Sequence, residues 1–499
     1  MNDLIIRRKR CLWMPPCLTT FAATLVIFCA SVWAEPRSLL ILHTNDLHDH
    51  VRADYDGAGG MAYVAGYIQG VKASRDDVLV FDAGDVMEKG DLVTFRSKST
   101  IMYEAIAQAG YDAIAPGNHD DAYGDEHLVD CAALATGVKV LAINLTDDDG
   151  KLVFAPSAIF QRNGLEIGVI GVFKPRDENA LSLDETIKAV VIEANRLEYE
   201  TDLIIVVAHL GVQDCRSIAT SATNVDVFVT GHTHQAIKKP IVQASTGALF
   251  VQAGSNAEYV GRLELSVDDE SGEIFSAIGE LIPMQHATVS HDAALQRYFT
   301  DQEALLASEA NDFVVNVDRT VGFMDLAYLG AEGIRRHAGA DLAFCHGSQI
   351  IRDSLHPGPA DVNAIFRTGG QRGHDIVQLE LTGAEIDAYV EGLLNSDWGK
   401  THWSGFSGST KRVNGRRVFL SNLNPNHRYT VAMPLKEWDT RFRRFFERES
   451  NSPYTTRILG LEPTPIMTNF TDGVVTILRL YDGSPHEIAQ MLREASSLD

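Results

Sequence analysis

Side chains that can bind metal ions follow five predicted β-strands in the first half of the sequence. Short runs rich in Val, Ile and Leu predict these strands at 38–43, 78–82, 111–115, 203–208 and 225–230. The donors that follow them are Asp46, His48, Asp85, Asn118, His209, His232 and His234. Seven oxygen and nitrogen donors are more than one ion needs, so the pattern predicts two metal ions that share a ligand.

The donor types indicate which metals the site takes. Carboxylate, amide and imidazole groups suit Zn, Mn, Co or Fe, and the sequence has no Cys-x-x-Cys pair that would indicate thiolate ligation. Asp85 is a carboxylate able to bridge two ions, and Asn118 is a neutral donor that limits the charge of the site. A single His at a strand end is more often a packing residue than a ligand, so the prediction rests on all five motifs in this order.

A layered α/β domain is the element pattern that positions these donors. From Ser38 to about Gln285, apolar strands alternate with stretches of helical periodicity. Helices are expected near 60–74, 98–109, 125–136 and 186–197, further strands at 138–144 and 167–173, and strands with turns over 240–285. Strands that are apolar on both faces and alternate with helices predict an α/β sandwich.

A second α/β unit follows from about Asn316 to the end of the chain. A helix pattern over 290–312 connects it to the first domain. Helices are expected near 325–338 and 383–394, and strands at 341–345, 375–381 and 428–433.

The first 34 residues have the pattern of a secretory signal. A basic start at 7–10 precedes an apolar stretch at 17–33, and the mature chain is expected to begin at Glu35. The apolar stretch is short for a membrane span, so no stable membrane anchor is expected. We therefore expect an exported protein, periplasmic or secreted.

Charge and cysteine content restrict the partners. The formal net charge is −24, and after residue 34 it is 39 − 66 = −27, which disfavours nucleic-acid polymers as partners. The three remaining cysteines, Cys131, Cys215 and Cys345, allow one disulfide and require none.

The donor motifs resemble those of the calcineurin-like metallophosphoesterases. They are Thr44-Asn45-Asp46-Leu47-His48, Gly84-Asp85, Gly117-Asn118-His119-Asp120, Ala208-His209-Leu210-Gly211 and Gly231-His232-Thr233-His234. Within that superfamily, nearly the whole mature chain resembles the exported 5′-nucleotidase/UDP-sugar hydrolase family. The resemblance implies a four-layer α/β/β/α sandwich over 35–287, a helical connector over 288–315 and a smaller C-terminal α/β substrate domain over 316–499.

The resemblance also implies roles for the donors. One ion is implied for Asp46, His48 and His234, and the other for Asn118, His209 and His232, with Asp85 between them. The implied reaction is in-line attack of a metal-activated water on a small phosphoester, and the resemblance implies a nucleotide as that ester. His119 is implied to contact the phosphoryl group or the leaving oxygen, as an electrostatic stabiliser or a general acid.

The sequence departs from the family at the residues that assist catalysis and grip the base. The family usually has an Asp three residues after the His that corresponds to His119. Here Ala122 stands there, which leaves open whether Asp120 or Asp121 substitutes. Thr368 and Lys436 occupy the places of the two rings that sandwich the base.

Few substrate contacts of the family are therefore retained. Arg352 is the one match among its polar substrate contacts. A stacking platform could be rebuilt from other aromatic residues, because any exposed ring can stack on a base. The candidates are Phe366, Trp403, Phe406 and Trp438.

Three functions stay open at this point. The first is a two-metal phosphoesterase that hydrolyses 5′-nucleotides or related phosphoesters. The second keeps this chemistry and acts on UDP-sugars, cyclic nucleotides or a non-nucleotide phosphoester. The third is a secreted binding protein without turnover, which the seven retained donors disfavour.

Overall fold

The computed structural model describes residues 36–174, 180–268, 271–347, 350–370, 375–395, 404–407, 410–413, 416–419 and 423–495. The segment expected to be a secretory signal, 1–34, lies outside the described residues. The chain divides into two compact units. The first contains the described residues up to Glu88 together with Lys98–Phe299, and the second contains Lys89–Ser97 and the chain from Thr300 onward. The domain boundaries expected at 287 and 316 stay predictions.

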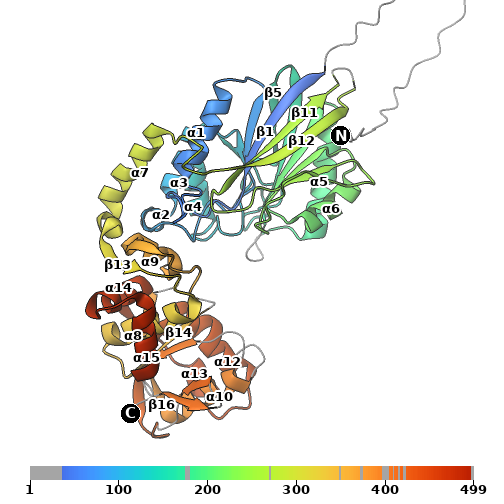
Figure 1. Ribbon diagram of the computed structural model, residues 1–499. Helices are drawn as coiled ribbons and strands as arrows, with labels where there is room; N and C mark the ends of the chain where they lie inside the picture. The colour runs from blue at the N-terminus through green and yellow to red at the C-terminus, as the bar shows by residue number, and fades with distance from the viewer. Residues whose placement is uncertain are drawn as a thin grey trace, which may run out of the picture. The chain divides into compact units, whose positions relative to one another are not determined.

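Two six-stranded sheets form the centre of the first unit (Figure 1). The first sheet has the order β12-β11-β1-β2-β3-β4, with the bounds Ile274–Pro283, Tyr259–Val267, Arg37–Thr44, Val78–Asp82, Ala113–Ile114 and Lys139–Val140. The second has the order β5-β6-β7-β8-β10-β9, with the bounds Ser157–Arg162, Leu165–Val172, Leu203–Ala208, Val227–Thr230, Leu249–Val251 and Ile241–Val242.

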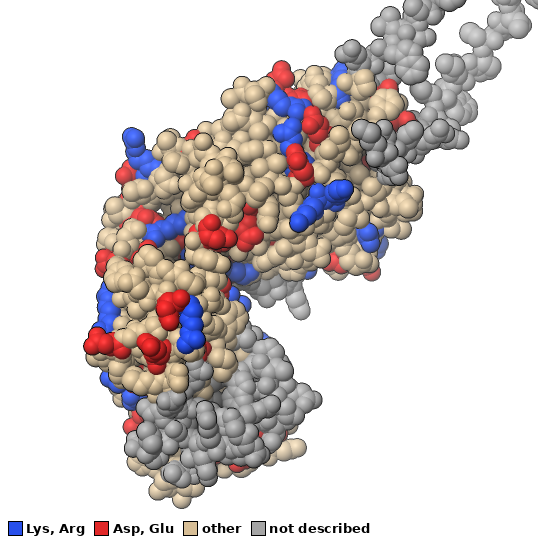
Figure 2. Space-filling view, viewed as in Figure 1, with Lys and Arg blue, Asp and Glu red and all other residues tan. Residues whose placement is uncertain are grey.

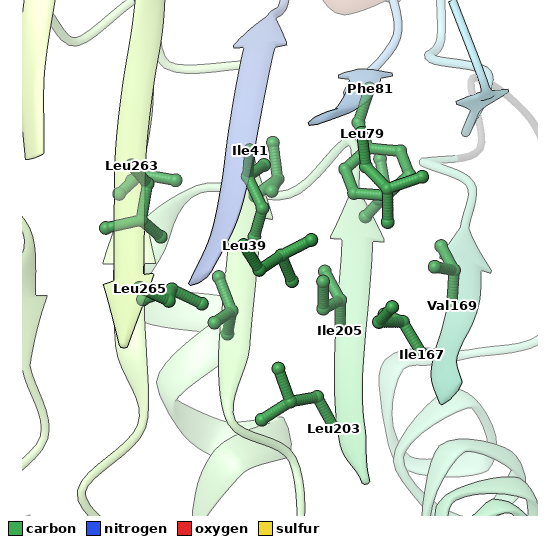
Figure 3. Close-up of a cluster of buried hydrophobic side chains, with 14 of the residues drawn as sticks. Leu39, Ile41, Leu79, Phe81, Ile167, Val169, Leu203, Ile205, Leu263 and Leu265 are labelled. Carbon is green, nitrogen blue, oxygen red and sulfur yellow. The ribbon is translucent and has the colours of Figure 1, made fainter. Parts of the chain in front are cut away.

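The two sheets pack face to face through alternate side chains of their strands. Leu39 and Ile41 of β1 point into this interface, and in Figure 3 they lie among side chains of β2, β6, β7 and β11. The whole of β1 from Leu39 to Thr44 is buried, because its other face is covered as well. This double burial explains why its sequence reads as a continuous apolar run rather than an alternating one.

Helices cover the outer faces of both sheets (Figure 1). Beside the first sheet lie α1 (Met61–Lys72), α3 (Thr100–Ala109) and α4 (Asp125–Leu134). Beside the second lie α5 (Leu183–Leu197) and α6 (Val212–Ser221), which share a hydrophobic cluster with its strands. The four-layer α/β/β/α arrangement predicted from the sequence is confirmed.

The helix ends follow local sequence signals. At the start of α5 the Ser182 hydroxyl accepts from the Glu185 N–H, and the Glu185 carboxylate accepts from the Ser182 N–H, which is a capping box. At the end of α3, Gly110 takes a left-handed conformation that terminates the helix.

The strand predicted at 138–144 is wrong in extent, since β4 contains only Lys139–Val140. The next residues divide their hydrogen bonds between the two sheets. The Leu141 N–H donates to Ile114 O in the first sheet, and the Ile143 N–H donates to Gly171 O in the second. An apolar run whose backbone groups hydrogen-bond to two different sheets looks like one strand in the sequence. In the structure it does not form one continuous strand. Strand β5 and helix α6 were not predicted.

The second unit is built on a five-stranded sheet, in the order β17-β14-β20-β16-β21. The bounds are Ser404–Ser407, Leu342–His346, Arg428–Pro434, Asp375–Thr382 and Thr464–Asn469. Its core gathers Phe344, Tyr389, Trp438, Phe442 and Phe446. Its helices are α8 (Phe323–Ala338), α9 (Val362–Gly369), α10 (Gly383–Asn395), α11 (Leu435–Glu437), α12 (Arg443–Arg448), α13 (Thr455–Leu459), α14 (Phe470–Leu480) and α15 (Pro485–Ala495).

Smaller elements complete the described chain. Strands β13 (Phe313–Val317) and β15 (Gly358–Asp361) pair with each other, as do β18 (Thr410–Val413) and β19 (Arg416–Phe419). Helix α7 (Ala293–Leu306) lies in the predicted connector, and the boundary between the two units falls within it.

One short segment from the first half of the chain packs within the second unit. Helix α2 (Leu92–Ser97) is joined to α9 by the amide of Asn363, which donates to Asp91 Oδ1 at 2.6 Å and accepts from the Leu92 N–H at 2.8 Å. Asp91 and Asn363 are both buried. The chain therefore leaves the first unit directly after Glu88 and returns to it at Lys98.

The described surface shows mixed charge. On the face drawn in Figure 2, basic and acidic side chains of the described residues are interspersed. No helix in the described ranges is both long enough and apolar enough to cross a membrane. Cys131, Cys215 and Cys345 are all buried, and none of the three forms a disulfide.

Candidate metal centre

Parallel pairing brings the donor-bearing loops to one edge of each sheet. In the first sheet Thr44 of β1 lies opposite Asp82 of β2, and Asp82 lies opposite Ile114 of β3. In the second sheet Ala208 of β7 lies opposite Thr230 of β8. Because these strands end at matching positions, the residues that follow them leave the sheets side by side.

The structure gathers Asp46, His48 and His234 into one group. Their ligand atoms all lie within 4.8 Å of one another. The two Nε2 atoms of His48 and His234 are 3.1 Å apart, and His234 Nε2 is 3.2 Å from Asp46 Oδ1. Two atoms that each lie about 2.1 Å from one ion are separated by roughly 3.0–3.4 Å at coordination angles of about 90–109°. These spacings fit one shared divalent ion.

A second group contains Asp85, His209 and His232. His209 Nε2 lies 3.1 Å from Asp85 Oδ2, and the same carboxylate oxygen lies 3.8 Å from His48 Nε2 in the first group. Asp85 thus faces both groups, as a bridging ligand must. Asn118 follows β3 and carries a buried Oδ1.

Several predicted donor atoms are buried without a hydrogen bond. Within the described chain, Asp46 Oδ1, Asn118 Oδ1 and His209 Nε2 have no hydrogen-bond partner. The other oxygen of Asp46 is well supplied, accepting from Asn45 Nδ2 at 2.6 Å and from the His232 N–H at 3.0 Å. A buried polar atom left unpaired costs about 1–3 kcal/mol. Divalent cations would satisfy all three atoms, so the donor set fits the metals that the sequence predicts.

Backbone carbonyls set the tautomers of two histidines. The His209 Nδ1–H donates to Ala83 O at 2.6 Å, and the His48 Nδ1–H donates to Met87 O at 3.2 Å. A proton held on Nδ1 leaves the lone pair on Nε2, the atom that each ring presents to its group. Burial is the largest cause that lowers the pKa of His232, to about 4. That imidazole is therefore neutral and able to act as a ligand at physiological pH.

Backbone strain is concentrated at the predicted ligands. Five of the seven have a positive φ between 47° and 68°, namely Asp46, His48, Asp85, His232 and His234. A non-glycine residue in this region costs on the order of 1–3 kcal/mol and persists only where its surroundings impose it. At each of these residues the positive φ angle changes the direction of the chain after the strand, so that the side chain is directed into the centre.

Two buried carboxylates hold the loop that carries Asp85. Asp120 accepts from the backbone N–H groups of Asp85, Val86 and Met87, and also from that of Gly117. Asp49 accepts from the next N–H, that of Glu88, at 2.7 Å. Every backbone donor from residue 85 to residue 88 is thus bonded to a carboxylate. Asp120 is committed to this loop.

The approach of Gly117 to Asp85 requires a residue without a side chain. A Cβ atom added at Gly117 would lie 2.3 Å from Asp85 Oδ1 and 2.7 Å from His209 Cδ2. Contacts this short cannot be relieved without moving both side chains. The glycine in the Gly117-Asn118-His119 motif is therefore part of the centre's geometry.

His119 lies beside the first group and is held at three points. Its backbone N–H donates to Asp85 Oδ1 at 2.7 Å, and its ring meets the His48 ring edge-on with centroids 5.1 Å apart. Its Nδ1 lies 2.6 Å from Glu88 Oε2. Glu88 was not predicted, because it belongs to no motif and reaches the ring only through the path of its loop. Ala122 is buried and carries no group that could take this place.

The residues at the predicted substrate-contact positions of the second unit differ in how exposed they are. Arg352 is exposed, and its backbone N–H donates to Thr368 O. Thr368 is buried, and its hydroxyl donates to Ile365 O within its own helix. Lys436 lies half-buried in α11, directly after β20.

The aromatic candidates for a stacking platform are mostly core residues. Trp438 is 2% exposed and stacks on Phe442, and Phe366 is 4% exposed and contacts Phe95. Both rings serve packing, as their burial requires, and neither offers a face to a ligand. The side chain of Phe406, like the whole of Trp403, lies outside the described part of the chain.

Comparison with known proteins agrees with this geometry. The sequence pattern of the calcineurin-like phosphoesterase family matches residues 39–236. A 5′-nucleotidase of Diplobatis ommata is 28% identical over 346 residues, which cover 62% of this chain and 59% of that protein. The chain thus spans less than two thirds of that relative. A 5′-nucleotidase of Vibrio parahaemolyticus is 25% identical over 471 residues, covering 79% of this chain and 82% of the relative.

A solved structure extends the likeness of fold to both units. The crystal structure of a 5′-nucleotidase precursor from Thermus thermophilus superposes with a TM-score of 0.66 at 21% identity. It covers 89% of this chain and 96% of the other. At this identity the likeness concerns the fold alone.

Proposed function

We propose that the protein is a two-metal hydrolase of small phosphoesters, because residues 39–236 match the calcineurin-like phosphoesterase family. The observation that carries the proposal is the pair of donor groups around Asp85, with Asp46 Oδ1, Asn118 Oδ1 and His209 Nε2 buried without a hydrogen bond in the described chain. The ligands are Asp46, His48 and His234 for one ion and Asn118, His209 and His232 for the other, with Asp85 shared. The ions are Zn, Mn, Co or Fe.

Two bound ions would supply an activated water for in-line attack on phosphorus and would neutralise charge on the phosphoryl oxygens. The protein's own part is to hold that geometry. Asp120 and Asp49 fix the backbone of the loop that presents Asp85, and carbonyls of Ala83 and Met87 orient two imidazoles. Because these bonds exist before substrate arrives, little reorganisation is needed during the reaction.

His119 completes the reaction at the leaving oxygen. It lies against His48 at the rim of the centre and is partly exposed, so it is within reach of a bound ester. Breakage of the phosphorus–oxygen bond leaves an alkoxide, and transfer of a proton from the ring neutralises it. Positioned general acids of this kind contribute about 10²–10⁴-fold.

The substrates we propose are 5′-nucleotides or related small phosphoesters. Similarity to proteins named 5′-nucleotidases over most of the chain supports the nucleotide class. A second candidate within the same chemistry is favoured because Thr368 has no ring and the ring of Trp438 is buried, so neither can stack on a base. That candidate is hydrolysis of UDP-sugars, cyclic nucleotides or a non-nucleotide ester.

We also propose that the protein acts outside the cytoplasm. The basic start and apolar stretch within the first 34 residues support export. An N-terminus that begins at Glu35 in the mature protein, read by peptide sequencing, is the expected result. Retention of the full chain in the cytoplasm would contradict the proposal.

Metal content and ester hydrolysis together test the enzymatic function. The purified chain should carry close to two transition-metal ions by elemental analysis and should hydrolyse at least one ester of a panel. The panel contains AMP, ribose 5-phosphate, UDP-glucose and a cyclic nucleotide. The product measured is phosphate for the monoesters and a nucleoside monophosphate for the UDP-sugar and the cyclic nucleotide. Chelation should abolish hydrolysis, and added Mn²⁺ or Zn²⁺ should restore it.

The outcomes separate the alternatives. Activity that survives exhaustive chelation would overturn the two-metal mechanism. Two bound ions without turnover of any ester would indicate a binding protein. Preference for AMP over ribose 5-phosphate would assign nucleotide specificity, and equal rates would favour the second candidate.

A further inference from the structure

We propose that Glu88 positions His119 for proton transfer to the leaving oxygen, in place of the aspartate that the resembled family keeps at the position of Ala122. This inference rests on the proposed function and adds a residue to it. Glu88 contacts neither the phosphoryl group nor the water in this scheme. It acts only through the imidazole of His119.

The bond between the two side chains is short and partly shielded from water. Glu88 Oε2 lies 2.6 Å from His119 Nδ1, and the side chains are 13% and 18% exposed. A hydrogen bond between an ionised carboxylate and an imidazole N–H at this distance is of the strong, charge-assisted type. A carboxylate only accepts here, so the proton must sit on Nδ1.

That proton determines which ring atom meets the substrate. With Nδ1–H directed at Glu88, Nε2 is the nitrogen that can serve the leaving oxygen. The carboxylate also stabilises the doubly protonated ring, which is the form that donates from Nε2 as the phosphorus–oxygen bond breaks. After the transfer the alcohol departs and the ring is neutral, still held at Nδ1.

Glu88 is itself held in place by a buried network. Its backbone N–H donates to Asp49 Oδ2 at 2.7 Å, and the same oxygen accepts from the Ser99 hydroxyl at 2.7 Å. Glu88 has a φ of +65°, a conformation that a glutamate adopts only under constraint. The loop thus bends where it must in order to direct the carboxylate back at His119.

Two other carboxylates near His119, those of Asp120 and Asp85, have partners of their own. Asp120 accepts from four backbone N–H groups, three of them in the loop that carries Asp85 and the fourth that of Gly117. Asp85 Oδ1 accepts from the His119 backbone, and its Oδ2 faces His209. The ring nitrogen is therefore served by a residue three positions after the shared ligand Asp85, rather than three positions after His119.

The test compares two esters that differ in their need for a proton. The leaving group of ribose 5-phosphate is a strongly basic alkoxide. The leaving group of p-nitrophenyl phosphate is the weakly basic p-nitrophenolate, which needs no proton. Glu88→Gln should lower kcat for ribose 5-phosphate by roughly 10–100-fold, as loss of such an orienting partner does. It should lower kcat for p-nitrophenyl phosphate by less than about threefold, with KM and metal content unchanged.

Two further variants control the result. Glu258→Gln removes one negative charge from another half-buried carboxylate whose charge reaches the centre at His234, and should affect both esters equally. In a His119→Ala background, Glu88→Gln should cause no additional loss, because its effect passes through the ring.

The possible failures are distinguishable. Equal losses on both esters, or loss of metal from Glu88→Gln, would overturn the positioning role and make Glu88 structural. An active wild type matched by Glu88→Gln on both esters would overturn this inference alone. A wild type that hydrolyses neither ester would overturn the proposed function and this inference with it.

Discussion

The donor-bearing edge of the first unit contrasts with the region around Thr368 and Lys436 in the second unit in how tightly the residues are constrained. In the first, positive φ angles, buried carboxylates and backbone carbonyls fix almost every predicted ligand. In the second, Thr368 and Lys436 stand where the resembled family keeps its base-stacking rings, and both fit their surroundings as ordinary residues.

This difference has a physical cause. Ligand atoms must converge within a few tenths of an ångström of the distances an ion accepts, so few other arrangements retain function. Stacking on a base needs only an exposed ring somewhere in reach, and it tolerates many positions. We therefore expect the metal ligands to tolerate fewer substitutions than the residues that would contact the rest of a substrate.

Removal of the shared carboxylate should produce the largest effect. In Asp85→Asn, one negative charge between the two donor groups is lost. Loss of several kcal/mol of charge stabilisation corresponds to a drop in kcat of roughly 10³-fold or more, with less metal bound. Asp77→Asn, at the opposite end of the same strand and outside the centre, should retain full metal content. A fully metallated, active Asp85→Asn protein would mean that the first unit is less constrained than its geometry indicates.

Gly117→Ala tests the constraint without changing any ligand. The added methyl would collide with Asp85 Oδ1 and His209 Cδ2. A displacement of about 1 Å in a catalytic site can cost roughly 10²-fold, so kcat should fall by about that factor. The matched control is Gly70→Ala on α1, where a Cβ meets nothing within 4 Å. Steady-state kinetics of the two variants should differ clearly, and equal rates would contradict the close packing.

Asn363→Ala should weaken the second unit while sparing the chemistry. The change removes buried bonds to Asp91 and to the Leu92 N–H, and each buried group so deprived costs about 1–3 kcal/mol. After residue 34 every tryptophan, Trp398, Trp403 and Trp438, belongs to the second unit. Tryptophan fluorescence should show that Asn363→Ala unfolds at a lower urea concentration than the wild type. The exposed Asn426→Ala should unfold at the same urea concentration as the wild type. A matching loss of bound metal would show that α2 also supports the first unit.

Lys436→Phe should give the smallest effect. It tests whether the less constrained region of the second unit can accept a ring that stacks on a base. A ring restored at a position where the family has one should gain about 1 kcal/mol of stacking with a base, or roughly fivefold in kcat/KM. The gain should appear for AMP and not for ribose 5-phosphate, because only AMP carries a base. Lys436→Leu, apolar but without a ring, is the control. A similar gain from Leu would point to loss of the lysine charge rather than to stacking.

Much of the first unit was predictable because its signals are local. Strands 78–82 and 203–208 match β2 and β7 residue for residue, since each is a short apolar run bounded by polar residues. The strand at 138–144 failed because its residues serve two sheets, and a run of apolar residues carries no information about which partner each one has. Helix α6 was not predicted for a different reason, because it is polar on average and buries only Cys215, Ile218 and Ala219.

The sequence alone established which donors follow which strands, and from the types and order of those donors a two-metal phosphoesterase could be inferred. Such motifs are contiguous, so their chemistry is visible before folding. Only the tertiary structure revealed that Glu88 bonds His119 Nδ1. Only the tertiary structure showed Trp438 and Phe366 buried. These outcomes depend on where a loop turns and on which face of an element packs inward, and long-range packing decides both.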